Sequence, residues 1–152
     1  MRVETEKVRG ALPDYPRTRD LGGGVTLIDT LHLGNPGTIG VYLLELPEGG
    51  HALIETGAGV TLPEVEAGLA ALGVGIGDLR YVLVTHIHLD HAGAAGAIAC
   101  RSGAELIVHE VGAPHLIDPS RLMASATRVY GDDLHRLWGT MEPAPAEHVR
   151  AV

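Results

Sequence analysis

The sequence of 152 residues predicts a single α/β domain, and three observations support this. Apolar segments of strand length alternate with segments of helical periodicity, which is typical of a sheet layered with helices. Hydrophobic residues make up 45% of the chain and charged residues 20%, which excludes an intrinsically disordered protein. A chain of this length can bury roughly 68–70% of its unfolded surface, enough for one core. We expect an N-terminal loop over 1–24, the domain over 25–140 and a linker over 141–152.

The first part of the chain is predicted to consist of loops and strands. Residues 10–24 contain two prolines and three consecutive glycines and are expected to form a loop. Residues 25–28 have the composition of a short strand. Residues 41–46 and 51–54 are apolar and are separated by Pro-Glu-Gly-Gly, so they are expected to form a hairpin.

A helix and a buried strand are expected next. Residues 62–72 place Leu and Val at helical spacing. Thr61 and Glu64 have the spacing of a capping box at the start of this helix. Residues 79–84 are mostly apolar without alternation, as expected of a strand that is buried on both faces.

Helices dominate the chain after this strand. Asp90 can cap a helix that runs through 92–100, and residues 105–109 have the composition of a further strand. Two more helices are expected over 122–129 and 134–138, separated by a glycine. The proline-rich residues that follow are expected to be extended.

Charge and composition exclude several classes of function. The net charge is −8 with neutral histidines and aromatic residues are 3% of the chain, so no nucleic-acid partner is expected. The single cysteine excludes an intramolecular disulfide. No apolar stretch is long enough to span a membrane, and the N-terminus lacks a signal-peptide pattern. We therefore expect a cytoplasmic protein with no membrane partner.

The most informative segment follows the predicted buried strand and reads Thr-His-Ile-His-Leu-Asp-His over residues 85–91. Alternate residues of an extended segment point to the same side, so His86 and His88 can hold one metal ion. Asp90 and His91 come where the chain turns towards a helix and can face a second ion. Imidazole and carboxylate groups are ligands of zinc, and also of iron and manganese. A surface loop that is merely rich in histidine fits poorly, because this segment lies between two ordered elements.

Other polar residues have simpler interpretations. Ser125 and Tyr130 lie on a predicted helix that can border a substrate pocket, although packing is the simpler role for both. The remaining histidines of the second half have irregular spacing and are expected to lie at the surface, cap helices or make local hydrogen bonds. These are His109, His115, His135 and His148.

Two motifs of the chain resemble those of a known family, the metallo-β-lactamase superfamily. Residues 85–91 resemble the metal-binding signature of that family. Residues 53–57 resemble its strand-end turn, with Glu55 where the family usually has Asp. The resemblance extends over most of residues 25–140 and implies the N-terminal βα half of the family's αβ/βα sandwich.

The resemblance also implies a metal-dependent hydrolase that acts on a small-molecule substrate. In that family, the residues matching His86 and His88 bind one zinc ion, and those matching Asp90 and His91 bind a second. The expected chemistry is attack by a zinc-activated hydroxide on a small ester, thioester, lactone or amide. Asp90 is the expected catalytic residue, because it would orient the hydroxide and carry its proton.

Two alternatives to an active hydrolase are considered. The family's second half supplies further metal ligands and the chain ends about where that half would begin, so a non-catalytic half-domain is the first alternative. Such a half would expose an apolar sheet face and can form a homo-oligomer through it. A mononuclear iron oxygenase of the same superfamily shares part of the motif and is the second alternative.

Overall fold

The computed structural model describes residues 14–152 and contains one mixed sheet of seven strands. The strands are β1 (Thr18–Gly22), β2 (Val25–Asp29), β3 (Gly40–Glu45), β4 (His51–Ile54), β5 (Leu79–Leu83), β6 (Glu105–Val108) and β7 (Val149–Ala151). They lie side by side in chain order, with β1 to β4 antiparallel and β4 to β7 parallel. The predicted α/β class is confirmed.

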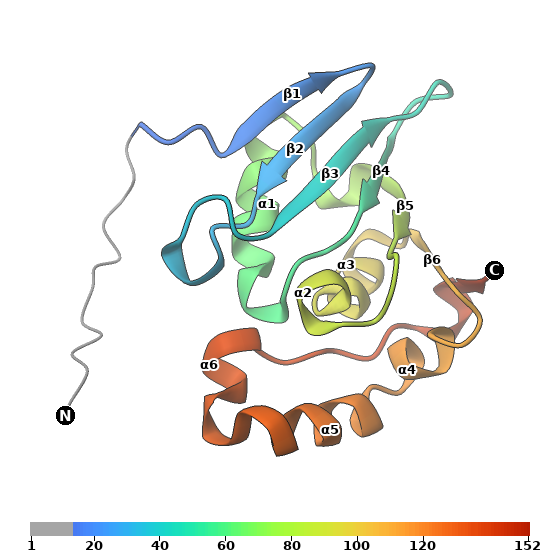
Figure 1. The fold of residues 1–152 in the computed structure, drawn as a ribbon. Helices are drawn as coiled ribbons and strands as arrows, with labels where there is room; N and C mark the ends of the chain where they lie inside the picture. The colour runs from blue at the N-terminus through green and yellow to red at the C-terminus, as the bar shows by residue number, and fades with distance from the viewer. Residues whose placement is uncertain (1–13) are drawn as a thin grey trace.

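The helices lie in the three crossover connections between the parallel strands. They are α1 (Leu62–Ala71), α2 (Leu89–Ala92), α3 (Ala95–Ser102), α4 (Ala113–Ile117), α5 (Ser120–Tyr130) and α6 (Leu134–Trp138). Figure 1 shows α1 behind the antiparallel strands and the row of α4, α5 and α6 along the bottom of the view. Within residues 14–152, no helix is long and apolar enough to cross a membrane. The cytoplasmic location stays a prediction.

Apolar residues on one face of the sheet form the core. Leu53, Val82 and Leu106 are fully buried and are aligned across β4, β5 and β6. At the antiparallel end, a Cβ atom on Gly68 of α1 would lie 2.3 Å from the side chain of Ile28, so glycine permits the close approach of this helix. Burial of this apolar face against α1 and α3 is the main force that holds the helices to the sheet.

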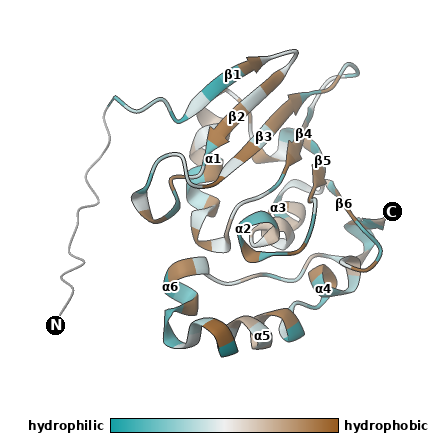
Figure 2. Cartoon of the chain, viewed as in Figure 1, coloured by the Kyte–Doolittle hydropathy of each residue, from teal (hydrophilic) through white to brown (hydrophobic). Residues whose placement is uncertain are grey.

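The opposite face of the sheet is also apolar, but residues 14–152 cover it only in part. Leu27, Tyr42, Ile54 and Leu83 are aligned in one row across β2 to β5. Tyr42 is 39% exposed and the other three are half-buried. Figure 2 shows hydrophobic colouring along these central strands. The prediction that the strand over 79–84 is buried on both faces is therefore wrong, because this face has no complete covering layer within the described residues.

The N-terminal loop predicted over 1–24 is wrong where residues 18–22 form β1, which pairs with β2. Gly22, Gly23 and Gly24 have φ values of 85°, 63° and 78° and form the turn between these strands. Because glycine adopts positive φ without steric cost, the three glycines mark a hairpin turn rather than a long loop. Residues 1–13 of the predicted loop lie outside the described residues.

The helix starts differ from the prediction. The Thr61 side chain makes no capping bond, and its hydroxyl donates instead to the carbonyl oxygen of Ala58 at 2.9 Å. The predicted capping box with Glu64 is therefore wrong. Asp90 does not cap a helix either: it lies within α2, and the chain leaves helical structure at Gly93–Ala94 before α3 begins. The remaining predicted helices and the hairpin of β3 and β4 are confirmed.

The C-terminal residues pack on the rest of the domain. Met141 and Ala144 are buried, and the backbone N–H of Ala144 donates to the carbonyl oxygen of Leu116 at 2.8 Å. The chain then forms β7, which pairs with β6 at the sheet edge. Residues 141–152, predicted to be a linker, are thus packed and extended apart from a 3-10 turn at Ala146–His148, while their role as a connection to a further half stays a prediction.

Candidate metal centre

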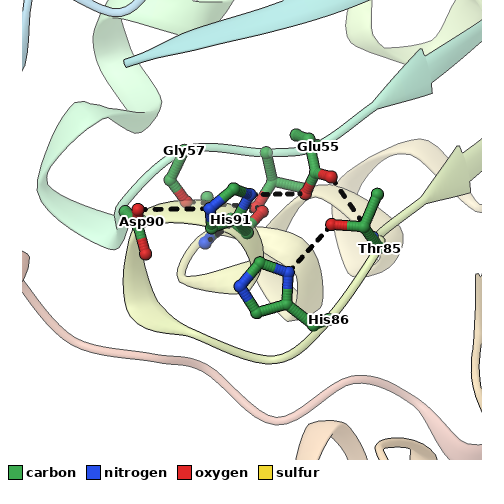
Figure 3. A network of polar contacts seen from close by, with 8 residues as sticks. Glu55, Gly57, Thr85, His86, Asp90 and His91 are labelled. Atoms are coloured by element: carbon green, nitrogen blue, oxygen red, sulfur yellow. Dashed lines mark hydrogen bonds and ion pairs between the residues drawn. The ribbon is translucent and has the colours of Figure 1, made fainter. Parts of the chain in front are cut away.

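The two motifs singled out in the sequence meet at one edge of the sheet. β4 and β5 are parallel neighbours, so their carboxyl ends lie together. Residues 55–57, which we call the strand-end turn, follow β4 directly. Residues 85–91, which we call the histidine loop, follow β5 and continue into α2. Figure 3 shows side chains of the two segments joined in one network of polar contacts.

Three imidazoles of the histidine loop lie against one another. The ring centroid of His86 is 4.7 Å from that of His88 and 4.1 Å from that of His91. The hydroxyl oxygen of Thr85 is 2.9 Å from Nδ1 of His86 and restricts the orientation of that ring. His88 is exposed and the other two rings are half-buried, so a ligand from solvent can reach them.

His91 lies between two carboxylates, as Figure 3 shows. Its Nδ1 is 3.3 Å from Oε2 of Glu55, and its Nε2 is 3.2 Å from Oδ2 of Asp90. A neutral imidazole carries one N–H and can donate to only one of these oxygens. With the proton on Nδ1, the Nε2 lone pair and the Asp90 oxygen face each other as two acceptors. A second proton on the ring or a metal cation stabilises such an arrangement, and imidazole nitrogen and carboxylate oxygen are donor types that bind zinc.

Glu55 favours that tautomer of His91. The residue is 7% exposed and its Oε2 atom is buried with no other hydrogen-bond partner, so His91 Nδ1 at 3.3 Å is the group placed to donate to it. The other oxygen, Oε1, accepts from the backbone N–H of Thr85 at 3.3 Å. Glu55 therefore contacts the histidine loop at two points. Its φ of 64°, which is rare for a residue with a side chain, shows that the strand-end turn is tightly constrained.

Thr56 fixes the backbone of the histidine loop. It is fully buried, and its backbone N–H and its hydroxyl both donate to the carbonyl oxygen of His91 at 2.8 Å. The hydroxyl oxygen also accepts from the backbone N–H of Ala94 at 3.3 Å. These bonds link the strand-end turn to both ends of the break between α2 and α3. The sequence motif contained Thr56, but nothing in the spacing of residues indicated this contact.

The histidine loop does not form a complete metal site alone. Within residues 14–152, no three His, Cys, Asp or Glu side chains converge in a geometry that would hold one ion. A catalytic zinc ion normally has three protein ligands, so further donors are needed. The assignment of His86, His88, Asp90 and His91 as metal ligands therefore stays a prediction.

The histidines of the second half outside the loop have different surroundings. Nδ1 of His109 accepts from the backbone N–H of Val111 at 3.1 Å, which is the local contact expected. His135 is exposed, as expected, and His115 is half-buried. Nδ1 of His148 is 3.3 Å from the carbonyl oxygen of Ala99 in α3, 49 residues away in the chain, so this contact is tertiary rather than local.

A groove of about 480 Å³ lies beside the histidine loop. One wall is formed by His88, Leu89 and Asp90, and the other by residues of α5 and α6. Ser125 and Tyr130 are among the lining residues, as the sequence suggested for a helix that borders a pocket. Trp138 was missed as a lining residue, since nothing in its sequence context shows that α6 folds back towards the loop.

The comparisons with known proteins agree with this arrangement. A family model described as the metallo-beta-lactamase superfamily matches residues 34–148. A metallo-beta-lactamase of Cronobacter sakazakii with a HARLDQ motif is 27% identical, with a TM-score of 0.58, over 67% of this chain and 38% of that chain. A comparison with curated proteins gives no match.

Two other solved structures match over more of this chain. The metallo-beta-lactamase SMB-1 in complex with mercaptoacetic acid is 25% identical, with a TM-score of 0.65, over 90% of this chain and 46% of that chain. The subclass B3 metallo-beta-lactamase BJP-1 of Bradyrhizobium japonicum is 22% identical, with a TM-score of 0.64, over 90% of this chain and 45% of that chain. The predicted fold and family are confirmed, and the chain spans less than half the length of these neighbours.

Proposed function

Because the chain belongs to the metallo-beta-lactamase superfamily, we propose that it carries the metal-binding loop of a metal-dependent hydrolase. The observation that carries this proposal is the position of His91 between the carboxylates of Glu55 and Asp90, beside two further imidazoles. A buried carboxylate that orients a histidine from behind is a common arrangement around metal ligands.

The proposed ligands are His86 and His88 for one zinc ion, and Asp90 and His91 for a second. Iron and manganese suit the same donors. When bound, these ions supply Lewis-acid activation of a water and of the carbonyl under attack. The proposed substrate is a small ester, thioester, lactone or amide.

The protein side chains prepare and assist this chemistry. Glu55 holds the Nδ1 proton of His91 and leaves Nε2 free as a ligand atom. Asp90 is half-buried at the edge of the groove, where its carboxylate can accept a proton from a nucleophilic water. Asp90 thus has two proposed roles, as a ligand and as a proton acceptor.

The test is zinc binding and hydrolase activity in the complete protein. We expect His86→Ala and Asp90→Ala each to lower hydrolysis of a responsive ester or lactone by about two orders of magnitude or more, because each removes a metal ligand. His109→Ala is the control, since that ring makes only a local contact, and it should retain activity. Near-wild-type turnover in either ligand variant would contradict the proposal.

A second candidate function is a metal-binding half-domain that needs another polypeptide for catalysis. Two observations favour it: no complete three-ligand site forms within residues 14–152, and one apolar sheet face is only partly covered. In this case the 152-residue chain binds zinc weakly, lacks turnover and associates through that face, with a second copy as one partner. Light scattering combined with elemental analysis separates it from the first proposal. Bound iron with oxygen-dependent activity would instead support the oxygenase alternative.

A further inference from the structure

The groove beside the histidine loop has two chemically different walls. The loop wall contains His88 and Asp90, which the proposed function assigns to the metal centre. The opposite wall is mainly apolar and is supplied by α5 and α6. Its lining residues are Leu122, Ser125, Ala126, Val129, Tyr130 and Trp138.

A cluster of three aromatic rings, one stacked pair and one edge-on pair, forms part of the apolar wall. Trp138 lies between His32 and Tyr130, with ring centroids 5.1 Å and 5.7 Å away. Nε2 of His32 is 2.6 Å from the carbonyl oxygen of Leu137, which fixes the cluster to α6. Two segments far apart in the sequence therefore hold one aromatic surface in place. A wall that is held in this way loses little conformational entropy when a ligand binds to it.

The lining residues also indicate which ligands do not fit. None of them is Lys or Arg, and the one acidic group is Asp90. The chain as a whole has a net charge of −8. A carboxylate or phosphate on the bound group would find no cation on the helical wall and would be repelled by the overall charge. Ser125 and Tyr130 provide hydroxyl groups, which tolerate a neutral polar atom.

We propose that this groove binds the uncharged apolar part of the substrate, an aryl ring or a short acyl chain, while the reacting carbonyl lies beside His88 and Asp90. The substrates would then be neutral aryl or acyl esters, thioesters, lactones or amides rather than anionic ones. This inference rests on the proposed function for the position of the reaction, but the groove itself can be tested without metal or turnover.

The fluorescence of Trp138 can be used to measure ligand binding in the groove. Trp138 is the single tryptophan of the protein and lines the groove, so its fluorescence reports directly on occupancy. We would titrate the full chain, freed of metal with a chelator, with 4-phenylbutyramide and, as a matched anionic ligand, with 4-phenylbutyrate. The account predicts that the amide changes the tryptophan emission and binds at least about tenfold more tightly than the carboxylate.

Two variants of α5 test whether the ligand lies in the groove. Ser125→Phe fills it and Val129→Glu places a charge on its apolar wall; both positions are exposed, so the fold should tolerate both changes. Each should weaken binding of 4-phenylbutyramide by about tenfold or more. The matched controls, Ala124→Phe and Arg128→Glu, lie on the same helix outside the groove and should change binding less than about twofold.

His86→Ala separates this inference from the proposed function, because His86 does not line the groove. This variant should bind less zinc and retain binding of the amide. Zinc binding without any tryptophan response to the amide would overturn the groove proposal and leave the hydrolase proposal intact. Equal affinity for the amide and the carboxylate, or equal losses in groove variants and controls, would also overturn it. Amide binding without zinc binding would instead overturn the hydrolase proposal alone.

Discussion

The strand-end turn and the histidine loop lie side by side but differ in burial. Glu55 and Thr56 of the turn are 7% and 0% exposed. Their backbone N–H groups donate to the carbonyl oxygens of Leu83 in β5 and His91 in the histidine loop, and the Glu55 side chain accepts from the backbone N–H of Thr85. The histidine loop is half-buried or exposed, and its rings contact one another rather than the core. The difference teaches that the buried turn fixes the backbone of the loop, while the loop carries the side chains that the proposed function assigns to metal binding.

The largest expected effect comes from a backbone clash where the chain after the histidine loop packs against the chain after the strand-end turn. A Cβ atom on Gly93 would lie 2.3 Å from the carbonyl oxygen of Leu89 and 2.7 Å from the backbone nitrogen of Gly59. We expect Gly93→Ala to lower the free energy of unfolding by about 3 kcal/mol, because backbone atoms cannot move aside cheaply. Urea denaturation would measure it. Gly77→Ala, at a position with open space, is the control, and equal losses in the two variants would contradict this account.

Thr56→Val removes the buried hydroxyl that joins the turn to the loop. The free energy of unfolding should fall by about 2 kcal/mol, since the N–H of Ala94 loses an acceptor and the carbonyl oxygen of His91 loses a donor. Thermal unfolding followed by circular dichroism would measure the change. Thr127→Val removes an exposed hydroxyl that bonds within α5, and it should change stability by less than about 0.5 kcal/mol.

Glu55→Gln separates the electrostatic role of the turn from its structural role, because it keeps the shape of the turn and removes the charge behind His91. We expect zinc affinity to fall by about tenfold, since the amide stabilises the required tautomer of His91 less well. Competition with a chromophoric chelator would measure the affinity. The control is Glu66→Gln, which removes a partly exposed ion pair with Arg101 far from the loop. Unchanged zinc affinity in Glu55→Gln would show that Glu55 has a purely structural role.

Most of the fold could be predicted from local sequence patterns. Apolar runs and helical periodicity located β2 to β6 and α1, α5 and α6 because these elements depend on their own residues. β7 was predicted as part of a linker because its partner, β6, is distant in the sequence. β1 pairs with the neighbouring β2, and it was missed because its three glycines were interpreted as part of a loop rather than as a hairpin turn. The break at Gly93 has a similar cause, because that residue packs against the chain near Gly59.

The candidate site was predicted only in part. The spacing of His86, His88, Asp90 and His91 predicted four metal donors. The structure brings the three imidazoles together, and their binding of metal stays a prediction. The role of Glu55 behind His91 and the groove wall at Trp138 depend on tertiary contacts across tens of residues. No local pattern reports such contacts, so the sequence could not indicate them.

The central claim is that the histidine loop binds metal while the buried turn holds it in place. Its most direct test is zinc stoichiometry, measured by elemental analysis on tag-free protein, in the unchanged chain and in the double variant His86→Ala/His88→Ala. We expect bound zinc in the unchanged chain and clearly less in the double variant, which keeps only the proposed Asp90 and His91 donors. The melting temperature of the double variant in the absence of zinc should match that of the unchanged chain. Equal zinc in both proteins, or none in either at saturating zinc, would contradict the claim.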